Sequence, residues 1–366
     1  MATVERASQP ISDAVPPRPA RGWFEAPPEQ YAALRGGVAI VDRSDRGKLA
    51  LTGPDAVEFL HGQVTNDIKG LVPGTGCYAA FLTPKGMMLG DLRVLAVGGN
   101  EAEVERGPSD QVVELLLDTE RITLQRLFDM IRRFKIGYRV ELHKRTLERC
   151  LVRLAGPGAR AFLAGLAPAL GSLPADEGSH LSGEVEGVSV RAIACEDGEV
   201  ELLCEAGERE RLVRALAAAG AVEVSQDSFE VVRVERGIPR YGYDLDDRTI
   251  PQEAGLNERA VSFTKGCYVG QETVARLYYK GKPNRHLRGL ALGRPAPIGT
   301  ALFRGDREVG RLGSVALSPT YGPIALAILR RECEEGDRLA VGQRGEYGSA
   351  LVKQPRFQPQ QVAVEG

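Results

Sequence analysis

The sequence predicts an α+β protein made of two related α+β units and a small antiparallel β-barrel near the C-terminus. A strand–turn–helix pattern, Leu-x-Gly-Pro-x-Ala-x-x-Phe-Leu, begins at Leu51 and recurs 103 positions later at Leu154. This repetition favours two related units, and chance similarity of two strand–helix corners is the alternative. From about Leu287 onward, short apolar segments alternate with glycine and proline, at intervals typical of a small barrel. A chain of 366 residues is also long for one core, so two or three domains are expected.

The first unit is predicted to span residues 22–145. An alternating strand at Lys48–Thr52 leads into a helix that begins beside Pro54. The segments Cys77–Leu82 and Met87–Leu95 then form a predicted β-hairpin. We therefore expect an α+β unit that contains this hairpin.

The terminal segments, residues 1–21 and 358–366, are predicted to be tails. The first contains four prolines and almost no large apolar side chains, which is typical of disorder. It also lacks the apolar segment of a secretory signal, so a cytoplasmic location is predicted.

The second unit is predicted to span residues 146–228, and residues 229–284 are expected to return the chain to the first unit. Residues 285–357 form the predicted barrel. Its strands are expected at Leu290–Leu292, Ala301–Phe303, Glu308–Gly310, Gly313–Leu317, Ile324–Ala327 and Leu339–Val341.

The most informative stretch is Lys265-Gly-Cys-Tyr-Val-Gly-Gln-Glu272, which follows a predicted short strand at Val261–Thr264. A lysine beside Cys267, and N–H groups of a helix that opens after it, would both favour the thiolate. The alternative is a buried cysteine in a tight turn. We expect Cys267 to be the functional thiol and Lys265 its electrostatic partner.

This stretch, together with the preceding Arg233-x-Glu-x-Gly-Ile-Pro239, resembles the signature of the YgfZ family. YgfZ proteins are relatives of the glycine-cleavage T-protein that bind folate and support iron–sulfur enzymes. The resemblance implies a T-protein-like fold with two ferredoxin-like α+β units and a terminal barrel. It also implies a tetrahydrofolate, or a one-carbon derivative of it, as cofactor. Residues expected to position this ligand or a partner are Arg236, Arg240, Tyr268, Gln271 and Glu272.

Two carboxylates are further candidates through the same resemblance. T-proteins carry an Asp-Asp pair where this chain has Gly90-Asp91, and a family aspartate there lies beside the reactive nitrogens of folate. Asp91 is therefore a candidate catalytic and folate-binding residue, or else a solvated strand residue. Glu196 matches the glutamate that binds the pterin ring in T-proteins, although Glu196-Asp197-Gly198 is equally suited to a hairpin turn.

A basic region covers residues 126–145. An apolar stripe of Leu124, Leu127, Phe128 and Ile131 predicts a helix with arginines on its outer face. The region is either a solvated surface or a binding site for an anion, such as a folate polyglutamate tail or, in a weak contact, tRNA.

Composition sets the remaining bounds. The net charge of −2 gives no general attraction to nucleic acid or to anionic membranes, and no apolar run is long enough to cross a bilayer. Six cysteines without a C-x-x-C pair, and only four histidines, argue against a built-in metal site.

The sequence therefore predicts a folate-binding protein that supports assembly or repair of iron–sulfur clusters through Cys267. Its partners would be client enzymes, including tRNA-thiolating enzymes, or the assembly machinery. Two alternatives stay open: a tetrahydrofolate-dependent aminomethyl or methyl transferase, and a non-catalytic folate-responsive scaffold.

Overall fold

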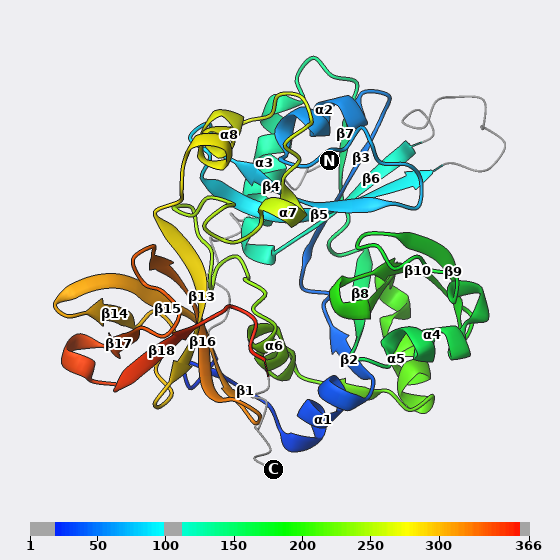
Figure 1. The fold of residues 1–366 in the computed structure, drawn as a ribbon. Helices are drawn as coiled ribbons and strands as arrows, with labels where there is room; N and C mark the ends of the chain where they lie inside the picture. The colour runs from blue at the N-terminus through cyan, green and yellow to red at the C-terminus, as the bar shows by residue number, and fades with distance from the viewer. Residues whose placement is uncertain (1–18, 99–111, 359–366) are drawn as a thin grey trace, which may run out of the picture.

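The computed structural model describes residues 19–98 and 112–358, which form three β-sheets with helices packed against them (Figure 1). The predicted α+β class with a C-terminal barrel is confirmed. The predicted tails at 1–21 and 358–366 lie almost wholly outside the described residues.

The first sheet has five antiparallel strands. In spatial order they are β4 (Gly76–Leu82), β5 (Met88–Gly98), β6 (Val112–Thr119), β3 (Gly47–Thr52) and β7 (Glu141–Lys144). Helices α2 (Ala56–Gln63) and α3 (Leu124–Phe134) contribute Phe59, Leu127 and Ile131 to its core. The predicted hairpin is the β4–β5 pair, and the predicted apolar stripe is the inner face of α3.

The second sheet has six strands. Their order is β12 (Val222–Val224), β2 (Ala39–Asp42), β8 (Arg149–Ala155), β11 (Val200–Glu205), β10 (Val188–Ala194) and β9 (His180–Val185). Helices α4 (Ala159–Leu166) and α5 (Arg209–Ala218) pack on it. Strand β2 lies within residues 22–145, the range predicted for the first unit, yet pairs with β8 and β12 of the second. The structure therefore corrects the predicted bounds of the first unit at β2, because Ile40 of this strand is buried in the core of the second unit.

The third sheet closes on itself through pairing of β15 with β16. Its barrel strands are β13 (Arg285–Leu292), β14 (Ala301–Arg304), β15 (Arg307–Ser318), β16 (Gly322–Arg330), β17 (Arg338–Val341) and β18 (Ser349–Lys353). Strand β1 (Phe24–Glu25) adds to β15 in parallel. Two predicted strands, at 308–310 and 313–317, are one strand with an irregular register between Leu312 and Val315. Strand β18 was not predicted.

The segment between the second sheet and the barrel contains three helices. Helix α6 (Gln226–Glu235) packs between α1 (Pro28–Gly36) and the barrel, whereas α7 (Asn257–Ala260) and α8 (Gln271–Lys280) return to the first unit (Figure 1). No strand forms at Val261–Thr264, in contrast to the prediction, because this segment pairs with no sheet and Ser262 N–H bonds a loop carbonyl at Thr65. Short 3-10 helices in the described connections are η3 (Arg121–Thr123), η4 (Pro168–Leu170), η5 (Glu196–Gly198), η6 (Ala206–Glu208) and η7 (Gln343–Gly345).

The repeated sequence corner has the same geometry in both units. Gly53 and Gly156 have φ angles of 104° and 103°. A Cβ atom would lie 2.3 Å from the carbonyl oxygen of Arg139 at the first position and 2.6 Å from that of Gly37 at the second. Only glycine fits this left-handed backbone and close approach, which is why the Gly-Pro pair recurs.

Candidate functional site

A cavity of about 110 Å³ lies where the first sheet, the second sheet and the return segment meet. Eight arginines and six carboxylates line it. The arginines are Arg43, Arg46, Arg93, Arg153, Arg233, Arg236, Arg240 and Arg259, and the carboxylates are Asp91, Asp118, Glu120, Glu177, Glu196 and Glu201. Four predicted site residues, Asp91, Glu196, Arg236 and Arg240, are thus brought together from positions far apart in the sequence.

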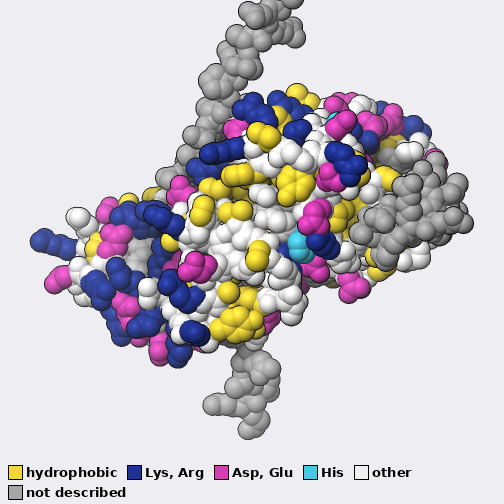
Figure 2. Space-filling model, turned by 90° about the horizontal axis from the view of Figure 1, so that it is seen from above, with side chains coloured by type: hydrophobic (Ala, Val, Ile, Leu, Met, Phe, Trp, Pro, Cys, Tyr) yellow, Lys and Arg dark blue, Asp and Glu magenta, His cyan; other side chains and the backbone are white. Residues whose placement is uncertain are grey.

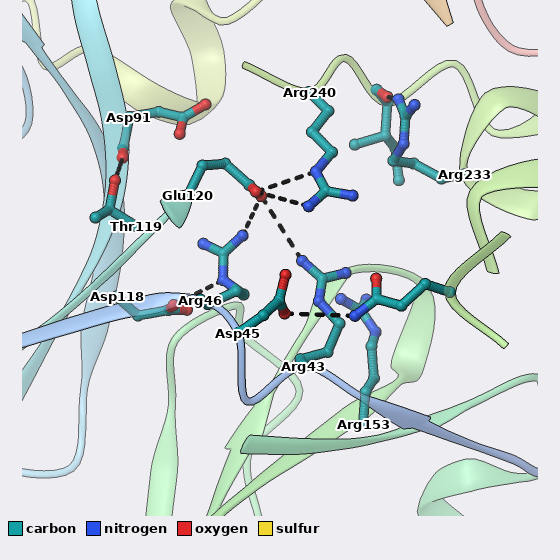
Figure 3. A network of polar contacts seen from close by, with 12 residues as sticks. Arg43, Asp45, Arg46, Asp91, Asp118, Thr119, Glu120, Arg153, Arg233 and Arg240 are labelled. Atoms are coloured by element: carbon teal, nitrogen blue, oxygen red, sulfur yellow. Dashed lines mark hydrogen bonds and ion pairs between the residues drawn. The ribbon is translucent and has the colours of Figure 1, made fainter. Parts of the chain in front are cut away.

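Glu120, directly after β6, is the centre of one ion network in this cavity. Arg240 donates to its Oε2 from Nε at 3.0 Å and from Nη2 at 2.9 Å, while Arg46 and Arg43 approach Oε1 (Figure 3). Burial by itself raises the pKa of Glu120, but the three guanidinium charges outweigh it and hold the pKa well below its usual range. Arg240 also bonds Glu230 at 2.9 Å, so this residue joins the first unit to α6.

A second network centres on Glu201 and Glu199 of the second sheet and its turn. Arg93 of the first sheet pairs with Glu201 at 2.6 Å, and Arg236 pairs with Glu199 at 2.6 Å. Arg236 and Arg240, which we expected to position a ligand, therefore already have buried carboxylate partners. Their recorded contacts hold the units together around the cavity.

Asp91 on β5 is only 4% exposed, so the alternative of a solvated strand residue is wrong. Tyr78 on the neighbouring strand donates its hydroxyl to Asp91 Oδ2 at 2.6 Å, and the described contacts give Oδ1 no partner. Burial raises the pKa of the Asp91 carboxyl, although the Tyr78 hydrogen bond opposes the shift. At the preceding position, a Cβ atom on Gly90 would lie 2.6 Å from the Phe81 ring and 2.7 Å from Thr123. The Phe81 and Thr123 side chains, as they are packed here, thus leave no room for a second aspartate at this position.

Glu196 is both a turn residue and a residue of the cavity. It lies in η5, which connects β10 to β11, and it lines the cavity wall. Arg259 of α7 forms an ion pair with it, and also bonds Glu177 through Nε at 2.8 Å and Nη2 at 2.5 Å. The Arg259 guanidinium lies 4.1 Å from the centre of the Tyr78 ring.

Cys267 lies outside this cavity, in the loop before α8. It is exposed, whereas Cys77 is half-buried and Cys150, Cys195, Cys204 and Cys333 are buried. A buried cysteine in a tight turn, the alternative considered above, is therefore wrong. None of Lys265, Cys267, Tyr268, Gln271 and Glu272 is among the described residues that line the cavity.

Tyr268 and Gly270 fix this loop on the β4–β5 hairpin. The Tyr268 ring is buried with Leu82, Met88 and Val274. Gly270 has a φ of 86°, and a Cβ atom there would lie 2.6 Å from the Thr83 carbonyl oxygen. Helix α8 begins at the next residue, as predicted.

Lys265 has partners other than the predicted one. Its Nζ donates to the carbonyl oxygens of His61, Val64 and Asn66 at 2.5, 2.7 and 2.8 Å. These three bonds use all three ammonium protons. Burial lowers the pKa of Lys265 to about 8. Its pairing with a Cys267 thiolate stays a prediction, and the described contacts do not favour it.

The basic region is largely paired. Arg126 lies 3.9 Å from Asp247, Arg139 bonds Asp55 at 2.8 Å and Arg145 bonds Glu148 at 2.7 Å. On the face seen from above, basic and acidic side chains are interspersed with hydrophobic ones (Figure 2). These pairs favour the solvated-surface alternative.

Within residues 19–98 and 112–358, no group of three or more His, Cys, Asp or Glu side chains is placed to hold a metal ion. Over the same residues, every helix is too short or too polar to cross a membrane.

Sequence reasoning missed Tyr78, Glu120 and Arg259. Tyr78 could have been predicted from the hairpin. Its register pairs Asp91 with Ala80, and Tyr78 lies two residues from Ala80 on the same face of the sheet. Glu120 and Arg259 had no such signal, because their partners are far away in the sequence.

The fold and the site now define a class of protein. The GCVT N-terminal domain family matches residues 5–265, which is more than half of the chain, so the chain belongs to this family. The crystal structure of the glycine cleavage system aminomethyltransferase T from Bartonella henselae has the same fold, with a TM-score of 0.77 and 22% identity. The similarity covers 91% of this chain and 89% of that one.

Relatives similar over most of their length define the family further. An aminomethyltransferase of Rubrobacter xylanophilus is 30% identical over 361 residues, covering 94% of this chain and 91% of the relative. A putative chloroplastic transferase of Arabidopsis thaliana is 28% identical over 328 residues, covering 87% and 72%. The chain is thus a T-protein-like member of the aminomethyltransferase family.

Proposed function

We propose that this protein binds a tetrahydrofolate, or a one-carbon derivative of it, in the central cavity. The observation that carries the proposal is the convergence there of Asp91 and Glu196, the two carboxylates that match folate-binding positions of T-proteins. The polar groups present also fit the ligand. Tyr78 bonds Oδ2 of Asp91 and the described contacts give Oδ1 no partner, and Arg43 and Arg93 each keep a buried Nε without one. A tetrahydrofolate would supply amine nitrogens that carry a one-carbon unit.

The roles of the residues follow from their surroundings. Asp91, buried and bonded to Tyr78, would hold a proton or accept one at its free Oδ1. Glu196 would accept the N–H donors at the pterin edge. Arg236 and Arg240 would act by holding the cavity walls in place through Glu199 and Glu120.

For the use of this folate, we propose support of iron–sulfur cluster assembly or repair in client enzymes, as the resemblance to YgfZ implies. Cys267 favours it, because its thiol is exposed and lies outside the cavity, where a protein partner could reach it. A thiolate is a suitable transient ligand for iron carried as cargo.

The test is the activity of an iron–sulfur tRNA methylthiolating enzyme in cells that lack the protein. Restoration by the native chain but not by Cys267→Ala supports the proposal. Restoration by both indicates a folate-responsive scaffold, and restoration by neither removes the iron–sulfur role. A separate test on the purified protein is charge reversal of Arg132 and Arg133, which should reduce affinity for polyglutamylated folate or for tRNA if the basic region binds an anion. Unchanged affinity for both would remove that contact.

The second candidate is aminomethyl transfer of the glycine-cleavage type. The matched relatives favour it, and so does Asp91, whose carboxylate is retained in the cavity. The loss of one aspartate at Gly90 and the presence of the cysteine motif disfavour it. Release of methylene-tetrahydrofolate from an aminomethylated lipoyl carrier protein would establish this activity, and Asp91→Asn should then abolish it.

A further inference from the structure

One side of the cavity is a binding site for a flat group, and the guanidinium of Arg259 occupies it. Glu177 and Glu196, from the segment before β9 and from η5, hold the Arg259 guanidinium between them. The Tyr78 ring lies against its flat face, at 4.1 Å from ring centre to guanidinium carbon. Two carboxylates and an aromatic face thus surround a planar group whose edge is made of N–H donors.

The same three elements suit the edge of a pterin. Its 2-amino group and ring N–H are neighbouring donors in one plane, like two N–H groups of a guanidinium, and a carboxylate accepts such a pair side by side. A flat ring stacks on a tyrosine face as a guanidinium does. The two groups therefore compete for the same surface.

The position of Arg259 adds a steric argument. Arg259, Glu196, Ile238 and Pro239 line both the central cavity and a second hollow of about 340 Å³ beside it. The second hollow is bounded by the return segment, the start of β13 and Pro355. The Arg259–Glu196 pair lies at the boundary, so displacing the guanidinium would join the two spaces.

We propose that Arg259 is a specificity-determining residue that competes with the pterin edge for Glu196 and the Tyr78 face. This inference rests on the proposed folate site. A ligand enters by replacing the guanidinium, which stays tethered to Glu177 or turns toward solvent. A ligand with an amidine-like donor edge satisfies Glu196 once the arginine has left. The Glu196 side chain is only 23% exposed, so leaving its carboxylate without a partner is costly.

The experiment compares two ligands on the full chain by calorimetry. One is 5-formyltetrahydrofolate, and the other is 4-aminobenzoylglutamate, which has the anionic part without the pterin. Arg259→Met keeps the apolar stem but removes the competing donors, and should bind 5-formyltetrahydrofolate about tenfold more tightly, a change of about 1.4 kcal/mol. The same variant should not bind 4-aminobenzoylglutamate more tightly, because for this anionic ligand the change only removes a nearby cation. Arg248→Met, an arginine 78% exposed and paired with Asp246, should change neither.

Unchanged or weaker binding of 5-formyltetrahydrofolate to Arg259→Met would overturn the inference while leaving the folate site in place. Equal tightening of both ligands would also overturn it, because the cavity would then simply be more open. If the native chain binds neither ligand, the proposed function fails and the inference with it. If Arg259→Met does not fold, Arg259→Lys takes its place in the experiment. It keeps a cation but cannot span Glu177 and Glu196, and about a threefold tightening is expected.

Discussion

At the scale of single residues, the cavity is lined by buried arginines and carboxylates whose opposite charges compensate each other. A buried ion pair contributes little net stability compared with apolar packing, but removing one partner leaves the other charge uncompensated. Glu120 is the extreme case, because three arginines from two parts of the chain depend on it.

Glu120→Gln should therefore lower the free energy of unfolding by about 3–5 kcal/mol, measured by urea denaturation. The matched control is Glu58→Gln, whose carboxylate pairs with Lys69 at 2.5 Å but is 62% exposed. That change should cost less than about 0.5 kcal/mol. Similar losses in both variants would show that burial of the Glu120 pairs is unimportant.

The same residue predicts a pH dependence. Because the folded pKa of Glu120 lies below its ordinary value of 4.5, its contribution is fully present above that pH and is lost as pH falls toward the folded value. Stability of the native chain should decline below pH 4.5 more steeply than that of Glu120→Gln. Parallel pH curves for the two proteins would contradict the assignment.

Cys267 should be the cysteine that reacts first in the native protein. Iodoacetamide should modify one thiol per chain, located by mass spectrometry, and none in Cys267→Ser. Cys77 is the informative comparison, since burial raises the pKa of its thiol to about 12 and leaves almost no thiolate at pH 8. Modification of Cys77 at a comparable rate would contradict the structure of this region.

At the scale of elements, the loop that carries Cys267 is held by the β4–β5 hairpin. Gly86 in the hairpin turn and Gly270 before α8 both have positive φ, and each lies close to the other's segment. The loop and the hairpin therefore form one structural element, which fixes the position of the exposed thiol relative to Asp91 on β5.

Gly270→Ala should destabilise this contact by about 1–3 kcal/mol, because alanine is strained at a φ of 86° and its Cβ would meet the Thr83 carbonyl. Gly266→Ala, in the same loop, has nothing within 4 Å of the added atom and should be nearly neutral. Hydrogen exchange of residues 262–280 provides the measurement. Faster exchange in the first variant only is expected, and equal exchange in both would exclude the contact as the cause.

At the scale of the whole molecule, the first unit, the second unit and the return segment meet around one cavity. The first and second sheets share a small apolar contact of Leu95, Leu151 and Ile193 outside the cavity, whereas the contacts that line the cavity are mainly ionic. A ligand that spans these walls should stabilise both units and the return segment at once.

Binding of 5-formyltetrahydrofolate at about 100 times its Kd should raise the free energy of unfolding by about 2.7 kcal/mol. Asp91→Asn should reduce this gain, because it removes a buried carboxylate that would face the ligand in the proposed site. Asp129→Asn changes a half-exposed carboxylate on α3 and should keep the full gain. Thermal unfolding with and without ligand provides the measurement, and equal gains in the two variants would remove Asp91 from the site.

The sequence by itself determined the local features: the two Gly-Pro corners, the β4–β5 hairpin, the apolar face of α3, most barrel strands and the start of α8. Each depends on backbone conformation or side-chain period within a few residues, so the pattern is visible in one dimension. The match of Asp91 and Glu196 to a known family predicted that both belong to one site, and in the structure both line one cavity.

Only the tertiary structure decided which charges meet. Arg236 and Arg240 look free in the sequence, but Glu199 and Glu120 lie 37 and 120 residues away from them and satisfy them in the fold. Lys265 bonds three carbonyl oxygens, Arg259 pairs with Glu196, and β2 joins the second sheet. Ion pairs and strand pairings of this kind leave no periodic pattern in the sequence. Any arginine can pair with any carboxylate, and only the packing of the apolar cores determines which of them are neighbours.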